Sequence, residues 1–62
     1  MIDNRKILKF VQRKEVITSS ELAEYLSVSW NTADKYLMEL AMQGEIRRFK
    51  KKGVTIWLPK KE

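Results

Sequence analysis

The sequence predicts a single small α+β domain whose elements follow in the order helix, strand, helix, helix, strand, strand. Apolar residues recur at helical spacing up to about residue 43, and after Gly44 the pattern changes to the alternation of β-strands. The 62 residues are 44% hydrophobic and 34% charged, as in a globular domain. A chain of this length buries only about 60% of its unfolded surface, so a deep pocket is not expected.

The first helix is predicted over about residues 3–14. Asp3 is a suitable N-cap, and four apolar residues fall on one arc of the helix: Ile7, Leu8, Phe10 and Val11. The next stretch, EVI at 15–17, is β-branched but too short for a helix. We expect its residues Val16 and Ile17 to pair with a later hairpin as a minimal third strand.

Two further helices are predicted over about 19–26 and 30–43. Thr18 and Glu21 form the S/T-x-x-E capping box that opens the first of them, and SVS at 27–29 ends it. Ser29 can cap the next helix, and Gly44 stands where a left-handed residue ends helices. The inward stripe of this helix is predicted to be Ala33, Leu37, Leu40 and Ala41.

A hairpin is predicted over about residues 46–58. IRRFK and VTIWLP alternate in the manner of strands, KKG lies between them, and Pro59 ends the second strand. Gly53 supplies the positive φ angle that a tight turn needs.

The net charge of +5 is unevenly distributed. Residues 1–45 carry 6 Lys/Arg against 7 Asp/Glu, a balance of −1, whereas residues 46–62 carry 7 Lys/Arg against Glu62 alone, a balance of +6. A basic run is often only a solvated face. Its confinement to one short hairpin nevertheless favours a polyanion as partner.

The absence of cysteine and histidine removes disulfides, thiolate sites, the usual zinc ligands and the usual near-neutral acid/base catalyst. No nucleophile and base can be paired and no phosphate-binding glycine loop is present, so we expect no enzyme, no metal, no cofactor and no small-molecule ligand. No apolar run approaches the roughly 20 residues of a membrane span, and the amino terminus lacks a secretory h-region. The expected location is the cytoplasm.

Residues 16–48, VITSSELAEYLSVSWNTADKYLMELAMQGEIRR, resemble the winged helix-turn-helix family, in particular small bacterial and archaeal transcriptional regulators. The shared pattern is T-x-x-E-L-A-x-x-L, then V-S, then x-x-T-A-x-K-x-L-x-x-L, and finally x-x-G-x-I. With the first helix and the hairpin, the resemblance covers nearly all of the chain, residues 1–62, as one domain.

The resemblance implies binding of double-stranded DNA, with the third helix as recognition helix in the major groove and the hairpin as a wing on the phosphate backbone. It leaves open whether the chain acts as a monomer or as a homodimer. The residues expected to contact DNA are Ser29, Trp30, Asn31, Thr32 and Lys35 of the helix start and Arg47, Arg48, Lys50, Lys51 and Lys52 of the wing.

Several of these side chains have a second interpretation. Trp30 either packs against the second helix or contacts sugar, phosphate or a thymine methyl at the groove, and Thr32 either reads the groove or supports the helix start with Ser29. Asp34 repels phosphate, and we expect it to accept from cytosine N4 or to hold a basic side chain.

Phe49 and Trp57 alternate with basic and β-branched neighbours, and the default expectation is that they pack against each other across the hairpin. A tryptophan in the wing is also a feature of winged domains that bind left-handed nucleic acid, and in this respect the chain resembles them. Those domains, however, have a tyrosine one turn after the helix asparagine, and here Lys35 follows Asn31.

The alternative function is that of a winged-helix protein interaction module in a larger assembly. The outward Met38 and Met42 are one helical turn apart, and with Trp30 and Asp34 they would form its adhesive surface. The basic wing is the feature that this alternative explains poorly.

Overall fold

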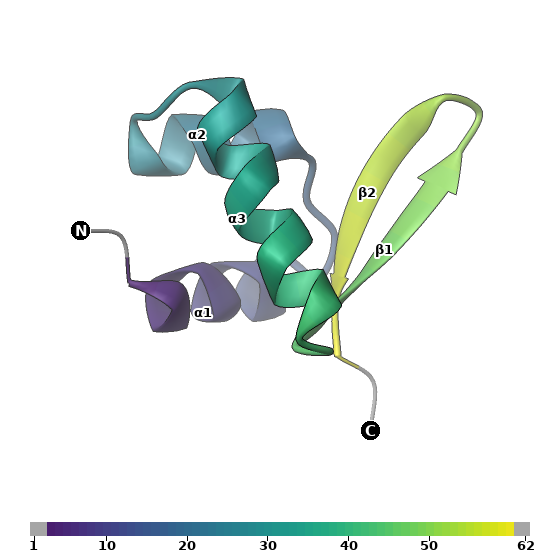
Figure 1. Cartoon of the computed structure of the whole chain (residues 1–62), viewed down its shortest axis with the longest axis horizontal. Coiled ribbons are helices and arrows are strands. Elements are labelled where there is room, and N and C mark those ends of the chain that lie inside the picture. Colours follow the sequence, from purple (N-terminus) through teal and green to yellow (C-terminus); the bar gives the residue numbers. More distant parts are fainter. Residues whose placement is uncertain (1–2, 61–62) are drawn as a thin grey trace.

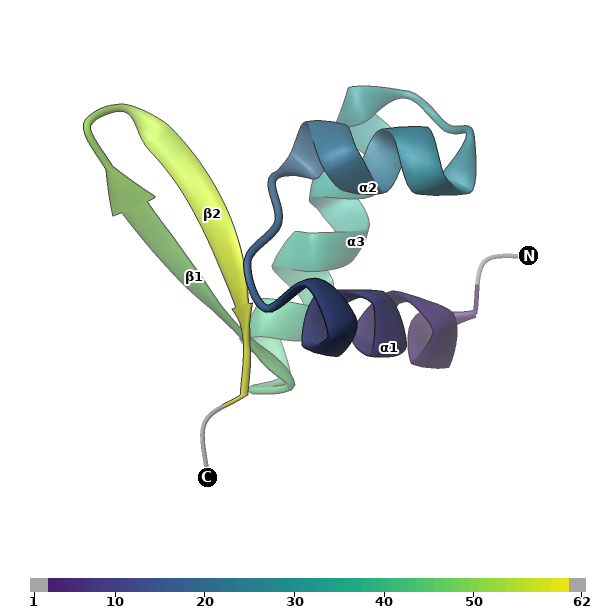
Figure 2. The same ribbon diagram turned by 180° about the vertical axis from the view of Figure 1, so that it is seen from behind.

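The computed structural model describes residues 3–60 and confirms the predicted fold class. Three helices are followed by two antiparallel strands: α1 (Asn4–Lys14), α2 (Ser19–Leu26), α3 (Trp30–Met42), β1 (Ile46–Lys51) and β2 (Val54–Pro59). The helices form one body, and the β1–β2 hairpin projects from it beside α3, with its tip away from α1 (Figures 1 and 2). None of the helices described is long and apolar enough to cross a membrane.

Each helix begins at a side chain that accepts a hydrogen bond from a backbone N–H of the first turn. Asp3 accepts from the Arg5 amide, 2.9 Å, at the start of α1. At the start of α2, Thr18 and Glu21 form both bonds of the capping box, at 3.0 and 3.2 Å. Ser29 accepts from the Thr32 amide, 3.3 Å, at the start of α3. These caps satisfy amides that a helix leaves unpaired at its N-terminus.

The end of α3 is a Schellman motif centred on Gly44, whose φ is +79°. The Gly44 amide donates to the Ala41 carbonyl, 3.0 Å, and the Glu45 amide donates to the Leu40 carbonyl, 2.9 Å. The chain therefore reverses directly into β1, which fixes where the hairpin leaves α3.

The hairpin has a two-residue turn, because Lys51 pairs with Val54. Both turn residues have positive φ, +51° at Lys52 and +79° at Gly53, as in the type I′ turns that match the twist of paired strands. The tip of the hairpin is consequently short and carries a lysine at its apex.

The expected third strand is reduced to one residue. Ile17 alone pairs with Trp57, through hydrogen bonds of 3.1 and 2.8 Å between their backbones, and Val16 lies outside this bridge. The positive φ of Glu15, +70°, lies just before this segment. The sheet of the described chain is therefore the two-stranded hairpin with a single-residue bridge.

The core is formed by one face of each helix and by one face of the hairpin. The predicted inward residues Ala33, Leu37 and Leu40 are buried, with Ala41 partly buried. Their buried partners are Ile7, Phe10, Val11, Ile17, Leu22, Ala23, Ile46 and Trp57.

The expected packing of Phe49 against Trp57 is wrong. In the observed register Trp57 is opposite Arg48, whereas Phe49 is opposite Ile56. Since successive residues of a strand point to opposite faces, the two rings lie on different sides of the hairpin. Trp57 is 0% exposed and belongs to the core, while Phe49 is 51% exposed on the outer face.

Candidate nucleic-acid interface

The exposed face of α3 carries the predicted groove-reading side chains. Asn31 and Lys35 are exposed, one helical turn apart, and the intervening Ala33 is fully buried against the core. Because the buried stripe fixes the rotation of the helix, both polar side chains point away from the domain. Their amide and ammonium groups are free to face a ligand on this side.

Ser29 and Thr32 have a structural role at the start of α3. Their hydroxyl oxygens are 2.9 Å apart, and the Ser29 oxygen also caps the helix. Thr32 is partly buried, whereas Ser29 is exposed. The Thr32 hydroxyl thus supports the helix start, as its second interpretation expected, and its contact with DNA stays a prediction.

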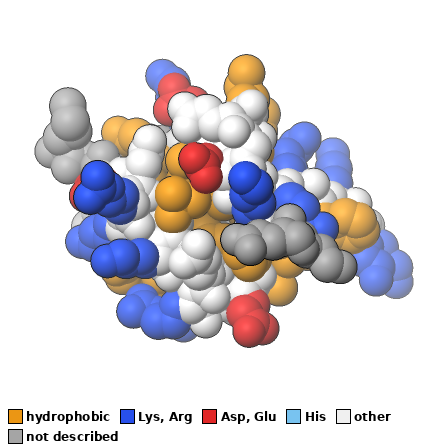
Figure 3. Space-filling view, turned by 90° about the horizontal axis from the view of Figure 1, so that it is seen from below, with side chains coloured by type: hydrophobic (Ala, Val, Ile, Leu, Met, Phe, Trp, Pro, Cys, Tyr) orange, Lys and Arg blue, Asp and Glu red, His pale blue; other side chains and the backbone are white. Residues whose placement is uncertain are grey.

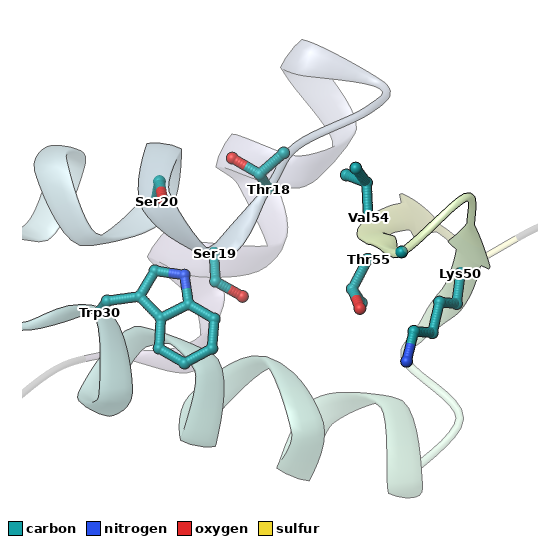
Figure 4. Close-up of a pocket in the computed structure, with 8 residues that line it drawn as sticks. Thr18, Ser19, Ser20, Trp30, Lys50, Val54 and Thr55 are labelled. Atoms are coloured by element: carbon teal, nitrogen blue, oxygen red, sulfur yellow. The ribbon is translucent and has the colours of Figure 1, made fainter.

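Trp30 stands at the edge of a hollow of about 430 Å³ between the helices and the hairpin. One wall is formed by residues 18–20 at the start of α2 and by Trp30, and the other by Lys50 and by the start of β2 at Val54 and Thr55. Figure 4 shows Trp30 beside Ser19 on one side, with Lys50, Val54 and Thr55 on the other. The Trp30 side chain is 52% exposed, so the domain covers only half of it.

The five basic residues of the wing do not form one row. Arg48 and Lys50 are on the inner face with Trp57, Arg47 and Lys51 are on the outer face, and Lys52 is at the tip. The Arg48 guanidinium lies 5.9 Å from the Trp57 ring centroid, and the Arg47 Nε donates to the Pro59 carbonyl at 3.4 Å. Of the inner pair, only Lys50 lines the hollow.

A chain of hydrogen bonds joins the hairpin to α3 through α2. The Trp57 Nε1 donates to the Ser19 Oγ, 3.1 Å, and the Ser19 hydroxyl donates to the Asp34 Oδ1, 2.8 Å. Trp57 is completely buried and Ser19 is 4% exposed, so their polar atoms need these partners. The Asp34 Oδ1 therefore has a partner that the sequence did not predict, the Ser19 hydroxyl. The expected contacts of Asp34 with cytosine N4 or with a basic side chain stay predictions.

Comparison with family models decides the class of the protein. The model described as HTH domain matches residues 4–56, which is most of the chain. The chain belongs to the HTH domain family. It is a helix-turn-helix DNA-binding domain, of a kind associated with transcription regulation. Comparison with curated proteins and with solved structures found no match.

Ser19 is the residue of this HTH domain that sequence reasoning missed. Its hydroxyl contacts residues 15 and 38 positions away in the chain. No local pattern predicts such a contact, because the capping box accounts for Thr18 and Glu21 and leaves Ser19 as an ordinary first-turn residue. The only signal in the sequence was an uncompensated Asp34 on a face predicted to meet phosphate.

Asp34 gives the HTH domain a test that separates hydrogen bonding from charge. Asp34→Asn keeps an acceptor for the Ser19 hydroxyl and removes a negative charge, so we expect stability to change by less than about 1 kcal/mol and duplex affinity to rise. Asp34→Ala removes the acceptor, and we expect a loss of about 1–2 kcal/mol in the free energy of unfolding. Urea denaturation followed by circular dichroism measures both, and equal destabilisation by the two variants would contradict this role.

Proposed function

We propose that this HTH domain is a transcription regulator that binds duplex DNA with α3 in the major groove and the β1–β2 hairpin on the phosphate backbone. The hollow between the start of α3 and the wing is the observation that carries the proposal. One wall is formed by residues 18–20 and the half-exposed ring of Trp30, and Lys50 lies on the other, so an indole at the start of α3 and a wing lysine line one concave surface. A regulator of this kind acts on nucleoid DNA in the cytoplasm.

Base selectivity is assigned to the start of α3. Asn31 can form a bidentate pair with adenine, and Lys35 can reach the acceptors of guanine or a phosphate. Both side chains are exposed and one turn apart, which suits successive contacts along a groove. Ser29 is assigned a phosphate contact, while Thr32 acts by holding the helix start.

The half-exposed ring of Trp30 is assigned to the deoxyribose or to a thymine methyl next to the hollow. An apolar contact needs no donor, and the indole already lies beside Ser19 at the edge of the concave surface (Figure 4). The alternative interpretation, packing against α2, concerns the covered half of the side chain, and the uncovered half is the part assigned to DNA.

Affinity is assigned to the basic side chains of the wing: Arg47, Arg48, Lys50, Lys51 and Lys52. Contacts of this kind position the protein on the duplex without reading its sequence. Each phosphate neutralised steepens the dependence of log K on log salt by about 0.9 on duplex DNA. Fluorescence anisotropy of a labelled random duplex between about 50 and 200 mM salt tests the proposal. No binding at the lowest salt would refute it.

Substitutions in α3 separate selectivity from affinity. We expect Trp30→Ala to lower affinity for every duplex by about 1 kcal/mol, as half of a large apolar side chain loses its contact. Asn31→Ala and Lys35→Ala should mainly reduce the preference among sequences, by about 1–3 kcal/mol for each bidentate pair lost. Anisotropy against a selected site and a scrambled duplex measures both quantities.

Gln43→Ala, in the exposed C-cap residue at the far end of α3, is the control and should change neither quantity. Equal losses on all sequences for Asn31→Ala and Lys35→Ala would remove the assignment of base selectivity to these residues.

A second candidate function is a protein interaction module. Phe49 and Val54 are 51% and 53% exposed on the outer face of the wing, and Met42 is 84% exposed at the end of α3. Such apolar side chains suit a protein partner. Recovery of a stoichiometric partner at high salt, resistant to nuclease, would favour this function over DNA binding.

A further inference from the structure

The outer face of α1 is a second basic surface. Residues 5–14 contain five Lys/Arg and no acidic residue. Ile7, Phe10 and Val11 turn one side of the helix into the core. Given 3.6 residues per turn, the opposite side carries a stripe of Arg5, Lys6, Lys9 and Arg13, all of them exposed.

The stripe is separated from the wing. The start of α3 and the tip of the hairpin point to one side of the molecule, and α1 lies on the other (Figures 1 and 2). Seen from below, basic side chains gather at the α1 end and again at the wing, with acidic side chains between them (Figure 3). In the sequence, residues 15–45 carry six Asp/Glu and a single basic residue, Lys35. A straight duplex held by α3 and the wing therefore does not extend over α1.

We infer that the α1 stripe binds the phosphate backbone of a second DNA duplex, so that one domain bridges two segments of DNA. The inference rests on the proposed function for the first duplex. Arg5, Lys9 and Arg13 follow one another at four-residue intervals, about 6 Å along the helix axis. A row of cations at such intervals faces a backbone that carries one negative charge per roughly 1.7 Å of duplex.

The chemistry of the stripe favours a phosphate backbone over a protein partner or a membrane surface. A protein interface has an apolar centre, whereas along the stripe Gln12 is polar and the nearby ring of Tyr25, 38% exposed, is approached by two of the stripe's own cations. A membrane-bound amphipathic helix inserts its apolar side, whereas that side of α1 is buried in the core. The ammonium of Lys6 and the guanidinium of Arg13 lie 5.4 and 6.0 Å from the Tyr25 ring centroid. These contacts orient the two side chains and leave their charge in place.

Two triple variants with the same change in net charge test the inference. Arg5→Gln/Lys9→Gln/Arg13→Gln alters the stripe, and Lys50→Gln/Lys51→Gln/Lys52→Gln alters the wing. To measure bridging, each protein is mixed with a bead-bound duplex and a free labelled duplex, and the label captured on the beads is counted. To measure affinity for one duplex, anisotropy is recorded on a single short labelled duplex. We expect the α1 variant to keep single-duplex affinity within a few-fold of wild type and to lose capture. The wing variant should lose both.

The outcomes separate this inference from the proposed function. A wild-type protein that binds no duplex refutes both, whereas one that binds a single duplex but captures no second refutes only the bridge. Capture that survives the α1 variant, with self-association of the DNA-free protein in analytical ultracentrifugation, would place the bridge in a dimer and overturn the inference. Circular dichroism checks the fold, and Arg5→Gln/Lys9→Gln is the milder variant because Arg13 also packs near Phe10.

Discussion

Trp57→Ala is expected to unfold the domain. The side chain is fully buried between the hairpin and the helices, and its loss creates a cavity that costs about 3–5 kcal/mol. It also removes the donor to Ser19. A chain of this length has a total stability of about 3–9 kcal/mol, so the cost is comparable to the whole. Far-ultraviolet circular dichroism should show loss of helix at room temperature or a thermal midpoint lowered by many degrees.

Two controls identify the cause of this loss. Trp57→Phe keeps most of the ring volume but cannot donate to the Ser19 Oγ, so we expect a folded protein destabilised by about 1–3 kcal/mol. Phe49→Ala alters the other aromatic of the hairpin on its exposed outer face and should change stability by less than about 1 kcal/mol. A Trp57→Ala protein as stable as Phe49→Ala would show that Trp57 is not part of the core.

Neutralising the wing is expected to have the largest effect on DNA binding. In the triple variant Lys50→Gln/Lys51→Gln/Lys52→Gln, three cations disappear from β1 and the hairpin tip, while the register of the strands is kept. If all three contact phosphates, the log-log salt slope falls by about 2.7, at roughly 0.9 per contact. Affinity near 100 mM salt should fall on the order of 10- to 100-fold for any duplex sequence.

Comparison with the α1 triple variant makes this prediction specific to position. Both variants lower the net charge by three, so a general effect of charge would reduce single-duplex affinity equally. We expect the wing variant alone to lower the salt slope on a single duplex. An unchanged slope in the wing variant would mean that its lysines are solubilising charges and do not contact phosphate.

Local signals in the sequence were sufficient to predict the helices and the turn. Thr18 and Glu21, Ser29, and Gly44 act on backbone groups within a few residues of themselves, so their effect can be inferred without knowledge of the tertiary structure. The pattern of apolar residues then predicted which side of α3 faces the core. The α+β layout with a hairpin after the third helix follows from these signals.

The hairpin faces could not be predicted in the same way. Phe49 and Trp57 both alternate with polar or β-branched neighbours, and a shift of one residue in register reverses the face of every side chain in a strand. Which ring is buried depends on the contacts of β2 with the helices and with Ile17, far away in the sequence. The same applies to Asp34, whose partner Ser19 is set by how α2 packs on α3.

In the candidate site, the exposed face of α3 could be predicted from the sequence, whereas the arrangement of the basic side chains could not. Exposure of Asn31 and Lys35 follows from helical periodicity, because the buried stripe determines the opposite face. The division of the wing cations between two faces depends on register, and the basic stripe on α1 was obscured by summing charge over residues 1–45, where acidic residues of the other helices offset it.

The two tryptophans differ in solvent exposure, so their fluorescence can report folding and DNA binding separately. Trp57 is 0% exposed and Trp30 is 52% exposed. Emission from the buried indole should be blue-shifted and should respond to unfolding, whereas emission from the exposed indole should be red-shifted and accessible to a quencher such as iodide. In Trp30→Phe and Trp57→Phe proteins each signal can be recorded alone. Loss of iodide quenching of Trp30 on addition of DNA, at constant Trp57 emission, would report occupation of the hollow in a protein that stays folded.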